Sequence, residues 1–255
     1  VAIFEEGSVF IPAPPVKVNP ALPAGDARPT DAQLQALAST IPVQPKRIAG
    51  VFAGNRVAQQ VGVSAVEATY QDAIQAARIV VRSVGLDLVV RQASPAGFHP
   101  GRTAELSVST AAGTFVLGYA GELDPKLTSE NDLPRRVSAF EIDLSQLYAV
   151  APKVIQAGAL GVMPAATQDL SLLVPSSVPA ADLQAVITEG AGPLLERIVL
   201  VDDYRGANLP EGKKSLTFAL RFRAEDRTLT QVEASEARDS AVALASERFG
   251  ASLRA

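Results

Sequence analysis

The stretch from Asp202 to Leu216 gathers residues able to do chemistry, because two adjacent carboxylates run into an aromatic ring. Successive residues of a strand point to opposite faces, so Asp202 and Asp203 do not converge on one substrate as an acid–base pair. The same alternation puts Asp202 and Tyr204 on one face. A tyrosine ring stacks on any nucleobase, for about 1–3 kcal/mol per base. An ionised carboxylate only accepts hydrogen bonds, which suits the adjacent N–H donors of an unpaired guanine.

The strand that carries this pair leaves a second interpretation open. Ile198 and Leu200 share the parity of Asp202 and Tyr204, so an unbroken strand buries all four side chains on one face. The pair reaches RNA only if a bulge or the strand end turns it outward. This alternation gives Asp203 no function.

Basic residues surround the acidic pair in sequence and predict contacts with phosphate groups. They fall within one hairpin: Arg205, Lys213, Lys214, Arg221, Arg223 and Arg227. The competing interpretation is a solvated hairpin whose lysines keep an edge strand soluble.

Catalytic and metal-binding residues are not indicated by the sequence. His99 is the single histidine, and no nucleophile motif or second histidine accompanies it. The chain has no cysteine, which excludes thiolate ligands and cysteine nucleophiles. We therefore predict no catalytic residue and no metal site, and interpret His99 as a turn residue bonded to nearby backbone.

The bulk composition points to a globular chain of one or two domains. It has 255 residues, of which 47% are hydrophobic, and a net charge of −4. The net charge argues against a generally basic coat but leaves a local basic face open. No apolar run approaches the roughly 20 residues of a membrane span. The absence of cysteine favours the cytoplasm, and the missing initiator methionine leads us to expect a piece of a longer protein.

The first part of the chain, residues 1–155, predicts an antiparallel sheet with few helices. Strands are expected at 2–5, 8–11, 46–54, 86–90, 104–109, 114–119 and 137–142. Capping boxes at Thr30 and Ser64 predict two helices, the second of which runs to Gly85.

The second part, residues 156–255, predicts a ferredoxin-like βαββαβ domain. The expected order is a strand at 169–174, a helix opened by Pro179, strands at 195–204 and 215–223, a helix capped by Thr230, and a strand near 251–253. Along 215–223, large apolar residues alternate with threonine, alanine and arginine. This alternation indicates one face in the core and one face open to water. The fold class is thus α+β.

Several blocks of sequence resemble the C-terminal part of the bacterial phenylalanyl-tRNA synthetase β subunit. In the second part these blocks are 201–206, 210–216, 227–230 and 247–254. In the first part, 4–10, 54–56, 98–105 and 118–125 look like the catalytic-like module that precedes the anticodon-binding domain of that family. The resemblance covers essentially the whole chain.

The resemblance implies a non-catalytic module at 1–155 and a ferredoxin-fold anticodon-binding domain at 156–255. The family's α subunit makes phenylalanyl-adenylate, so ATP, Mg²⁺ and phenylalanine belong to the whole enzyme, and this chain is expected to hold no cofactor. Its expected partners are the anticodon loop of tRNA-Phe, the α subunit and a second β subunit in an α2β2 assembly. The alternative role is mainly a structural module packed on the α subunit.

The resemblance places the contacts with guanine, the first anticodon base, at Asp202 and Tyr204. Two features depart from the family's pattern. Where the family has a phenylalanine-proline pair followed by two arginines, this chain has the run 163–169, so those arginine contacts do not carry over. Val201 replaces the family's common phenylalanine, which leaves less aromatic surface near the site.

Overall fold

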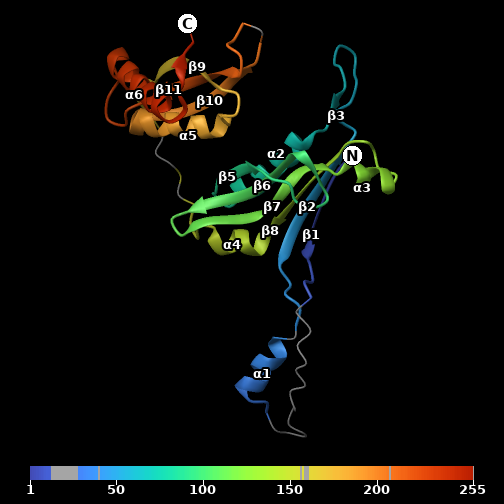
Figure 1. Ribbon diagram of the computed structural model, residues 1–255. Helices are drawn as coiled ribbons and strands as arrows, with labels where there is room; N and C mark the ends of the chain where they lie inside the picture. Colours follow the sequence, from blue (N-terminus) through green and yellow to red (C-terminus); the bar gives the residue numbers. More distant parts are fainter. Residues whose placement is uncertain (13–27, 40, 156, 158–160, 207, 255) are drawn as a thin grey trace. The chain divides into compact units, whose positions relative to one another are not determined.

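A computed structural model describes residues 1–12, 28–39, 41–155, 157, 161–206 and 208–254 (Figure 1). The chain divides into two compact units, Val1–Gln156 and Ala157–Ala255. The division falls one residue from the expected boundary. Each unit has its own sheet and its own hydrophobic core.

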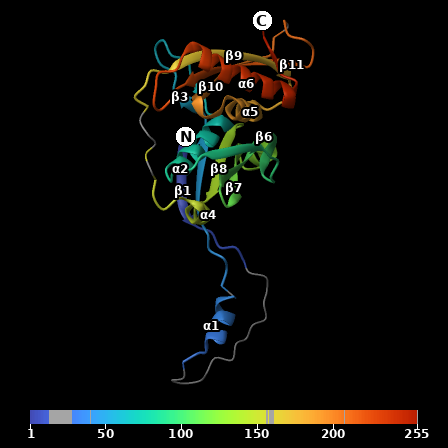
Figure 2. The same cartoon turned by 90° about the vertical axis from the view of Figure 1, so that its left-hand side faces the viewer.

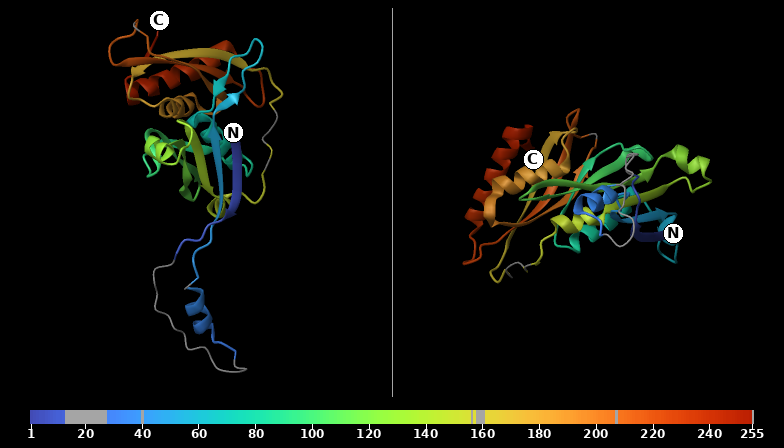
Figure 3. Two further views of the ribbon diagram at one scale, coloured as in Figure 1. Left: turned by 90° about the vertical axis from the view of Figure 1, so that its right-hand side faces the viewer. Right: turned by 90° about the horizontal axis from the view of Figure 1, so that it is seen from below.

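The first unit is built on a six-stranded antiparallel sheet with the order β1-β2-β8-β7-β6-β5. Its strands are β1 (Ala2–Ser8), β2 (Lys46–Ala53), β5 (Leu88–Gln92), β6 (Phe98–Thr110), β7 (Gly113–Leu123) and β8 (Val137–Asp143). A separate small ribbon pairs β3 (Asn55–Val57) with β4 (Val66–Glu67). Figure 3 shows β1 and β2 side by side at the edge of the sheet.

The helices of the first unit are α1 (Asp31–Ala38), α2 (Tyr70–Arg82), α3 (Pro125–Glu130) and α4 (Leu144–Val150). The α2 helix covers one face of the large sheet, where Ala73, Ala77 and Val81 are completely buried. The small side chains of the two alanines let the helix approach the sheet closely. Opposite them the sheet contributes the rest of the core, which includes Leu106, Val108, Ala120, Phe140 and Ile142.

Two sequence predictions in this unit are wrong in detail. The capping box expected at Ser64 does not start a helix, because Val66 pairs with Val57 and Glu67 forms an ion pair with Arg136 at 3.1 Å. The α2 helix begins after Thr69, whose backbone N–H donates to Asp72 at 2.8 Å. In place of the two expected strands at 2–5 and 8–11 there is one strand, β1, which continues through Gly7 to Ser8 in register with β2, and Ile11 forms only an isolated bridge with Val43.

The second unit has the predicted ferredoxin-like order of elements. These are β9 (Ala166–Pro175), α5 (Ala180–Ala191), the short 3-10 helix η1 (Gly192–Leu194), β10 (Leu195–Tyr204), β11 (Lys213–Phe222), α6 (Gln231–Phe249) and β12 (Ser252–Leu253). The sheet order is β10-β11-β9-β12, so β10 and β12 are the edges. The mixed α and β composition with antiparallel sheets confirms the predicted fold class.

Helices α5 and α6 lie together on one side of this sheet (Figure 2). Gly190 allows their close approach, because a Cβ at this position would lie 2.7 Å from the Cα of Ala241. Beneath the helices, every second residue of β11 is buried in the core: Leu216, Phe218, Leu220 and Phe222. The predicted alternation of β11 is therefore confirmed, and the residues between these four belong to the open face of the sheet.

Candidate functional site

The predicted base-reading pair lies on the open face of the second unit because β10 contains a bulge. Leu200 pairs with Phe218, whose side chain belongs to the helix-covered core. The register then shifts, and Asp202 pairs with Thr217 on the opposite face. Tyr204 follows two residues later on that same open face. The extra residue, Val201, thus supplies the outward turn that the sequence pattern requires.

The ring of Tyr204 is held by three neighbours. It pairs in register with Ser215, which is completely buried. The Arg254 guanidinium lies over the ring, 4.8 Å from its centroid. At Gly206, a Cβ would come within 2.0 Å of the phenol oxygen, so only glycine lets the loop pass the ring in this way. Tyr204 is consequently half-buried, with its position fixed before any ligand binds.

A polar row crosses the open face beside this ring. Asp202 pairs with Thr217, and Thr217 pairs with Ser171. The hydroxyl groups of Ser171 and Thr217 share a hydrogen bond of 2.9 Å. The backbone N–H of Arg254 donates to the Ser171 carbonyl at 3.0 Å, which brings Arg254 into the row. Asp202 is exposed and forms no ion pair with any described residue, so its carboxylate is available as an acceptor.

Arg254 was not among the residues predicted from the sequence, because it lies far along the chain from the hairpin. The pairing of β12 with β9 returns the chain end to the open face. A ring and a guanidinium stacked in this way form a platform that attracts both a base and a phosphate group.

The predicted basic residues do not gather in one place. Arg221 and Arg223 both pair with Glu196, at 2.5 and 2.9 Å. Arg223 also donates to the carbonyl oxygens of Gly161 and Met163. Arg221 lies six positions beyond Ser215 on β11, or about 20 Å along the strand. These two arginines therefore stabilise the far end of the sheet and lie away from Tyr204.

The position of Lys214 also differs from the sequence prediction. The predicted approach of Lys214 to phosphate requires an exposed side chain, but this residue is only 3% exposed. It lies on the helix-covered face of β11, two residues before Leu216. Burial lowers the pKa of the Lys214 ammonium group, and the attraction of Asp203 opposes that shift. Lys213 has the other parity, is half-buried, and belongs to the open face.

Asp203 and Arg205 form an ion pair on the side of β10 that faces away from Asp202. Arg205 donates from Nε and Nη2 to the two carboxylate oxygens, both at 2.9 Å. The hydrogen bonds from Arg205 lower the pKa of Asp203, and the charge of Lys214 acts in the same direction. Arg205 thus already has an anionic partner.

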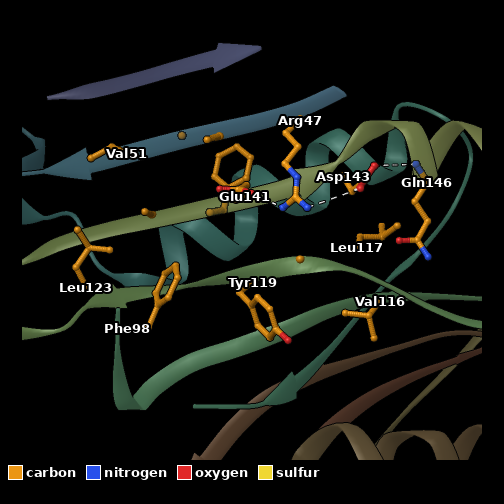
Figure 4. A pocket seen from close by; sticks show the side chains of 15 residues that line it. Arg47, Val51, Phe98, Val116, Leu117, Tyr119, Leu123, Glu141, Asp143 and Gln146 are labelled. Carbon is orange, nitrogen blue, oxygen red and sulfur yellow. Dashed lines mark hydrogen bonds and ion pairs between the residues drawn. The ribbon is translucent and has the colours of Figure 1, made fainter. Parts of the chain in front are cut away.

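A hollow of about 460 Å³ in the first unit lies on the sheet face opposite α2 (Figure 4). At one end, the Arg47 guanidinium lies between Glu141 and Asp143. Phe98 and Leu123 line the other end. Asp143 also accepts from the Gln146 backbone N–H at 2.9 Å and so caps α4. Ion pairs and the helix cap hold Arg47 and Asp143 in place, although Arg47 Nε is buried without a hydrogen-bond partner among the described atoms.

His99 makes local contacts only. The Gly101 N–H donates to its Nδ1 at 3.0 Å, and Arg102 Nη2 lies 3.0 Å from its Nε2. Arg102 continues to the buried carboxylate of Glu122, at 2.9 Å. Within the described ranges, no three histidine or acidic side chains come together as metal ligands. No helix among those residues is long and apolar enough to cross a membrane.

Comparison with known proteins gives matches over both units. Residues 162–254 match the ferredoxin-fold anticodon binding domain, and residues 1–144 match the phenylalanyl tRNA synthetase beta chain CLM domain. The phenylalanine–tRNA ligase beta subunit of Leifsonia xyli is 49% identical over 254 residues, which is 100% of this chain and 30% of that protein. Those of Streptomyces avermitilis and Thermobifida fusca are 46% and 43% identical, again over 100% of this chain and 30% of each relative. The chain thus spans 30% of the length of these relatives.

Proposed function

The chain belongs to the phenylalanine–tRNA ligase beta subunit family, and on that premise we propose that its second unit binds the anticodon loop of tRNA-Phe. The observation that carries the proposal is the grouping of Asp202, Tyr204 and Arg254 on one open sheet face. An anticodon-binding domain is present, and this is the face that joins an aromatic ring, a free carboxylate and a cation.

In this proposal Tyr204 stacks on the first anticodon base, and Asp202 accepts hydrogen bonds from the Watson–Crick edge of that base, a guanine. Arg254 and Lys213 neutralise the neighbouring phosphate groups. Arg205 contributes at most in part, because Asp203 already holds it. Arg221, Arg223 and Lys214 are left out of the RNA-binding surface, since the first two are held by Glu196 and the third is buried.

The wider role follows from the family. We propose that the chain is a non-catalytic part of an ATP-dependent ligase that works in the cytoplasm, with a partner α subunit that carries out aminoacylation. The α2β2 stoichiometry belongs to the same proposal. The ion pairs of Arg47 with Glu141 and Asp143, and the capping of α4 by Asp143, support a structural role for that unit.

Binding of an isolated anticodon stem-loop tests the proposal. Filter binding at low salt is expected to give measurable affinity for the tRNA-Phe stem-loop and much weaker binding of a stem-loop whose loop sequence is scrambled. Equal retention of the two RNAs argues against anticodon recognition.

A second candidate role is assembly, in which the chain packs on the α subunit and makes little RNA contact. Exposed apolar residues on β1 and α2 favour it, among them Ile3, Phe4 and Ile79 at 62%, 76% and 62% exposure. Co-purification with the α subunit, combined with no binding of the stem-loop, would select this role over the first.

A further inference from the structure

The first unit carries a cluster of arginines around the β3–β4 ribbon. Two hollows of about 440 and 270 Å³ adjoin there, since Glu67 of β4 lines both. Four arginines line them, Arg56 and Arg78 in the first hollow and Arg135 and Arg136 in the second. We infer that this arginine cluster binds the phosphodiester backbone of helical RNA. The inference goes beyond the proposed function, because it concerns the other unit and involves no reading of a base.

Carboxylates neutralise only half of the positive charge of the arginine cluster. Among the described residues that line the two hollows, the acids are Glu67 and Asp72. Glu67 pairs with Arg136 at 3.1 Å, and Asp72 pairs with Arg56 at 3.4 Å. The loop that joins β3 to β4, residues 58–65, contains no charged residue. The cluster therefore keeps an excess of two positive charges on a chain whose net charge is −4.

Arg78 and Arg135 carry the charge that no carboxylate neutralises. Arg135 is exposed and forms no ion pair within the described ranges. Arg78 donates from Nη1 to the side chain of Gln75, on its own helix, at 3.1 Å, and it too has no acidic partner among the described residues. Both guanidinium groups thus have N–H donors left, and the planar fork of these donors matches two oxygens of a phosphate group.

The lining of the two hollows indicates which polyanion the cluster binds. None of the described lining residues is aromatic, whereas proteins that bind single strands stack bases on aromatic rings. Cations without rings contact the backbone alone, as in the recognition of RNA helices by shape and phosphate groups. Gln71 and Gln75 of α2 line the first hollow and are exposed. Their amide groups can bond to a 2′-hydroxyl, which RNA has and DNA lacks.

Filter binding of a blunt RNA duplex to the whole chain tests the inference. A duplex of about 16 base pairs matches the span of known RNA-helix-binding domains. It has no loop, so the proposed anticodon site does not recognise it. The stem of an isolated anticodon stem-loop is shorter and offers fewer phosphate groups, so the cluster adds little to binding of that RNA.

The informative variant is Arg78→Gln/Arg135→Gln, which removes two positive charges and leaves both carboxylates with their partners. Affinity for the duplex is expected to fall about tenfold at low salt, because two phosphate contacts are lost. The slope of log affinity against log salt concentration should become shallower by about two. A DNA duplex of the same sequence is expected to bind the parent chain about threefold more weakly than the RNA duplex.

The matched control is Arg28→Gln/Arg91→Gln. Both of these arginines are exposed, lie outside the two hollows and form no ion pair with described residues. The same loss of charge should therefore leave duplex affinity within about twofold of the parent value. A second variant, Arg78→Lys/Arg135→Lys, keeps the charge and should bind within about threefold, because lysine contacts phosphate as a point charge. Its retained binding separates loss of charge from loss of folding.

Several results would overturn the inference. These are no binding of the RNA duplex by the parent chain, equal affinity for the DNA duplex, or a glutamine double variant that binds as well as the matched control. If that variant instead fails to co-purify with the α subunit while its duplex affinity is unchanged, the arginine cluster contacts protein and the inference is wrong.

The same assay separates this inference from the proposed function. Tyr204→Ala should leave duplex affinity unchanged, since the ring belongs to the second unit. A chain that binds the duplex through the arginine cluster but does not prefer the tRNA-Phe stem-loop over its scrambled form contradicts the proposed function and supports this inference. A chain that prefers the stem-loop but binds no duplex gives the opposite result.

Discussion

The two units each present an antiparallel sheet with one helix-covered face and one open face, yet the open faces differ in charge and shape. In the first unit, one row across the open face reads Glu5, Ala49, Glu141, Tyr119, Glu105 and Arg91. In the second, a tyrosine stacked with an arginine lies beside a free carboxylate and two hydroxyl groups. Sheet architecture alone therefore does not make an RNA-binding surface, and the placement of cations and rings decides it.

The strongest test of this contrast compares two tyrosines. Tyr204→Ala is expected to weaken binding of the anticodon stem-loop by roughly 1–3 kcal/mol, because a stacked base loses its platform. Tyr119→Ala removes the tyrosine of the first unit's open face and should leave affinity unchanged. Filter binding of both variants measures the difference, and similar losses in the two would remove the distinction between the faces.

A smaller effect is expected from Arg254. Arg254→Ala removes a guanidinium from the Tyr204 ring and a positive charge from the RNA surface. Affinity should fall by about 0.5–1 kcal/mol, the scale of an exposed cation–π contact. If Arg254 also neutralises a phosphate, the salt dependence of binding becomes shallower by about one unit of slope. Arg221→Ala is the control, since Glu196 holds that arginine at the far end of β11; an equal loss there would indicate a diffuse basic face.

Acidic residues on the two faces offer a third comparison. Asp169 is exposed on the open face of the second unit, where it pairs with Ala219. Asp169→Asn is expected to raise affinity for the stem-loop by about 0.2–0.5 kcal/mol, because a charge repelling phosphate is removed. Glu105→Gln makes the same change on the first unit's open face and should have no effect. An increase in affinity from Glu105→Gln would indicate that the RNA also contacts the first unit.

The smallest expected effect is a loss of stability against unfolding at low pH. In the second unit, hydrogen bonds from arginines or from a helix cap lower the pKa of Asp203, Glu189 and Glu233 below ordinary values of 3.8 and 4.5. A carboxyl with a depressed folded-state pKa contributes stability above its unfolded pKa and loses it as pH falls through the folded value. Thermal unfolding of the second unit should thus be insensitive to pH from 7 to about 5 and lose stability below about 4.

Glu189→Gln removes one of these contributions, the pair with Arg248 across α5 and α6. Its unfolding temperature should depend less on pH below 4 than that of the parent chain. An acid response that is identical in the variant would show that other groups control it.

Structure could be predicted from the sequence where it depends on neighbouring residues alone, as in strand alternation and helix capping. The alternation along β11 and the capping box at Thr230 were predicted and are present. Prediction of the helix start failed where two capping-box patterns lie close together, at Ser64 and at Thr69. The pairing of Val66 with Val57 and the ion pair of Glu67 with Arg136 exclude the first of them.

The candidate site was predictable only in part, because the pairing of the strands decides which face each side chain occupies. The parity of Asp202 and Tyr204 was evident, but the bulge at Val201 depends on pairing with β11 and has no local signature. Lys214 looked equivalent to Lys213, although the strand sends them to opposite faces. Arg254 joins the site only through the pairing of β12 with β9. Each of these outcomes requires knowledge of which strands are neighbours.

The most direct test of base reading is the affinity of the parent chain and of Asp202→Asn for two anticodon stem-loops, one with guanine and one with adenine as the first anticodon base. A carboxylate that accepts two hydrogen bonds from guanine should favour it by about 1–3 kcal/mol, and Asp202→Asn should abolish most of that preference. Tyr204→Ala should weaken the binding of both stem-loops equally, since stacking does not distinguish the bases. Equal affinity of the parent chain for the two stem-loops would contradict the proposal that this face reads the first anticodon base.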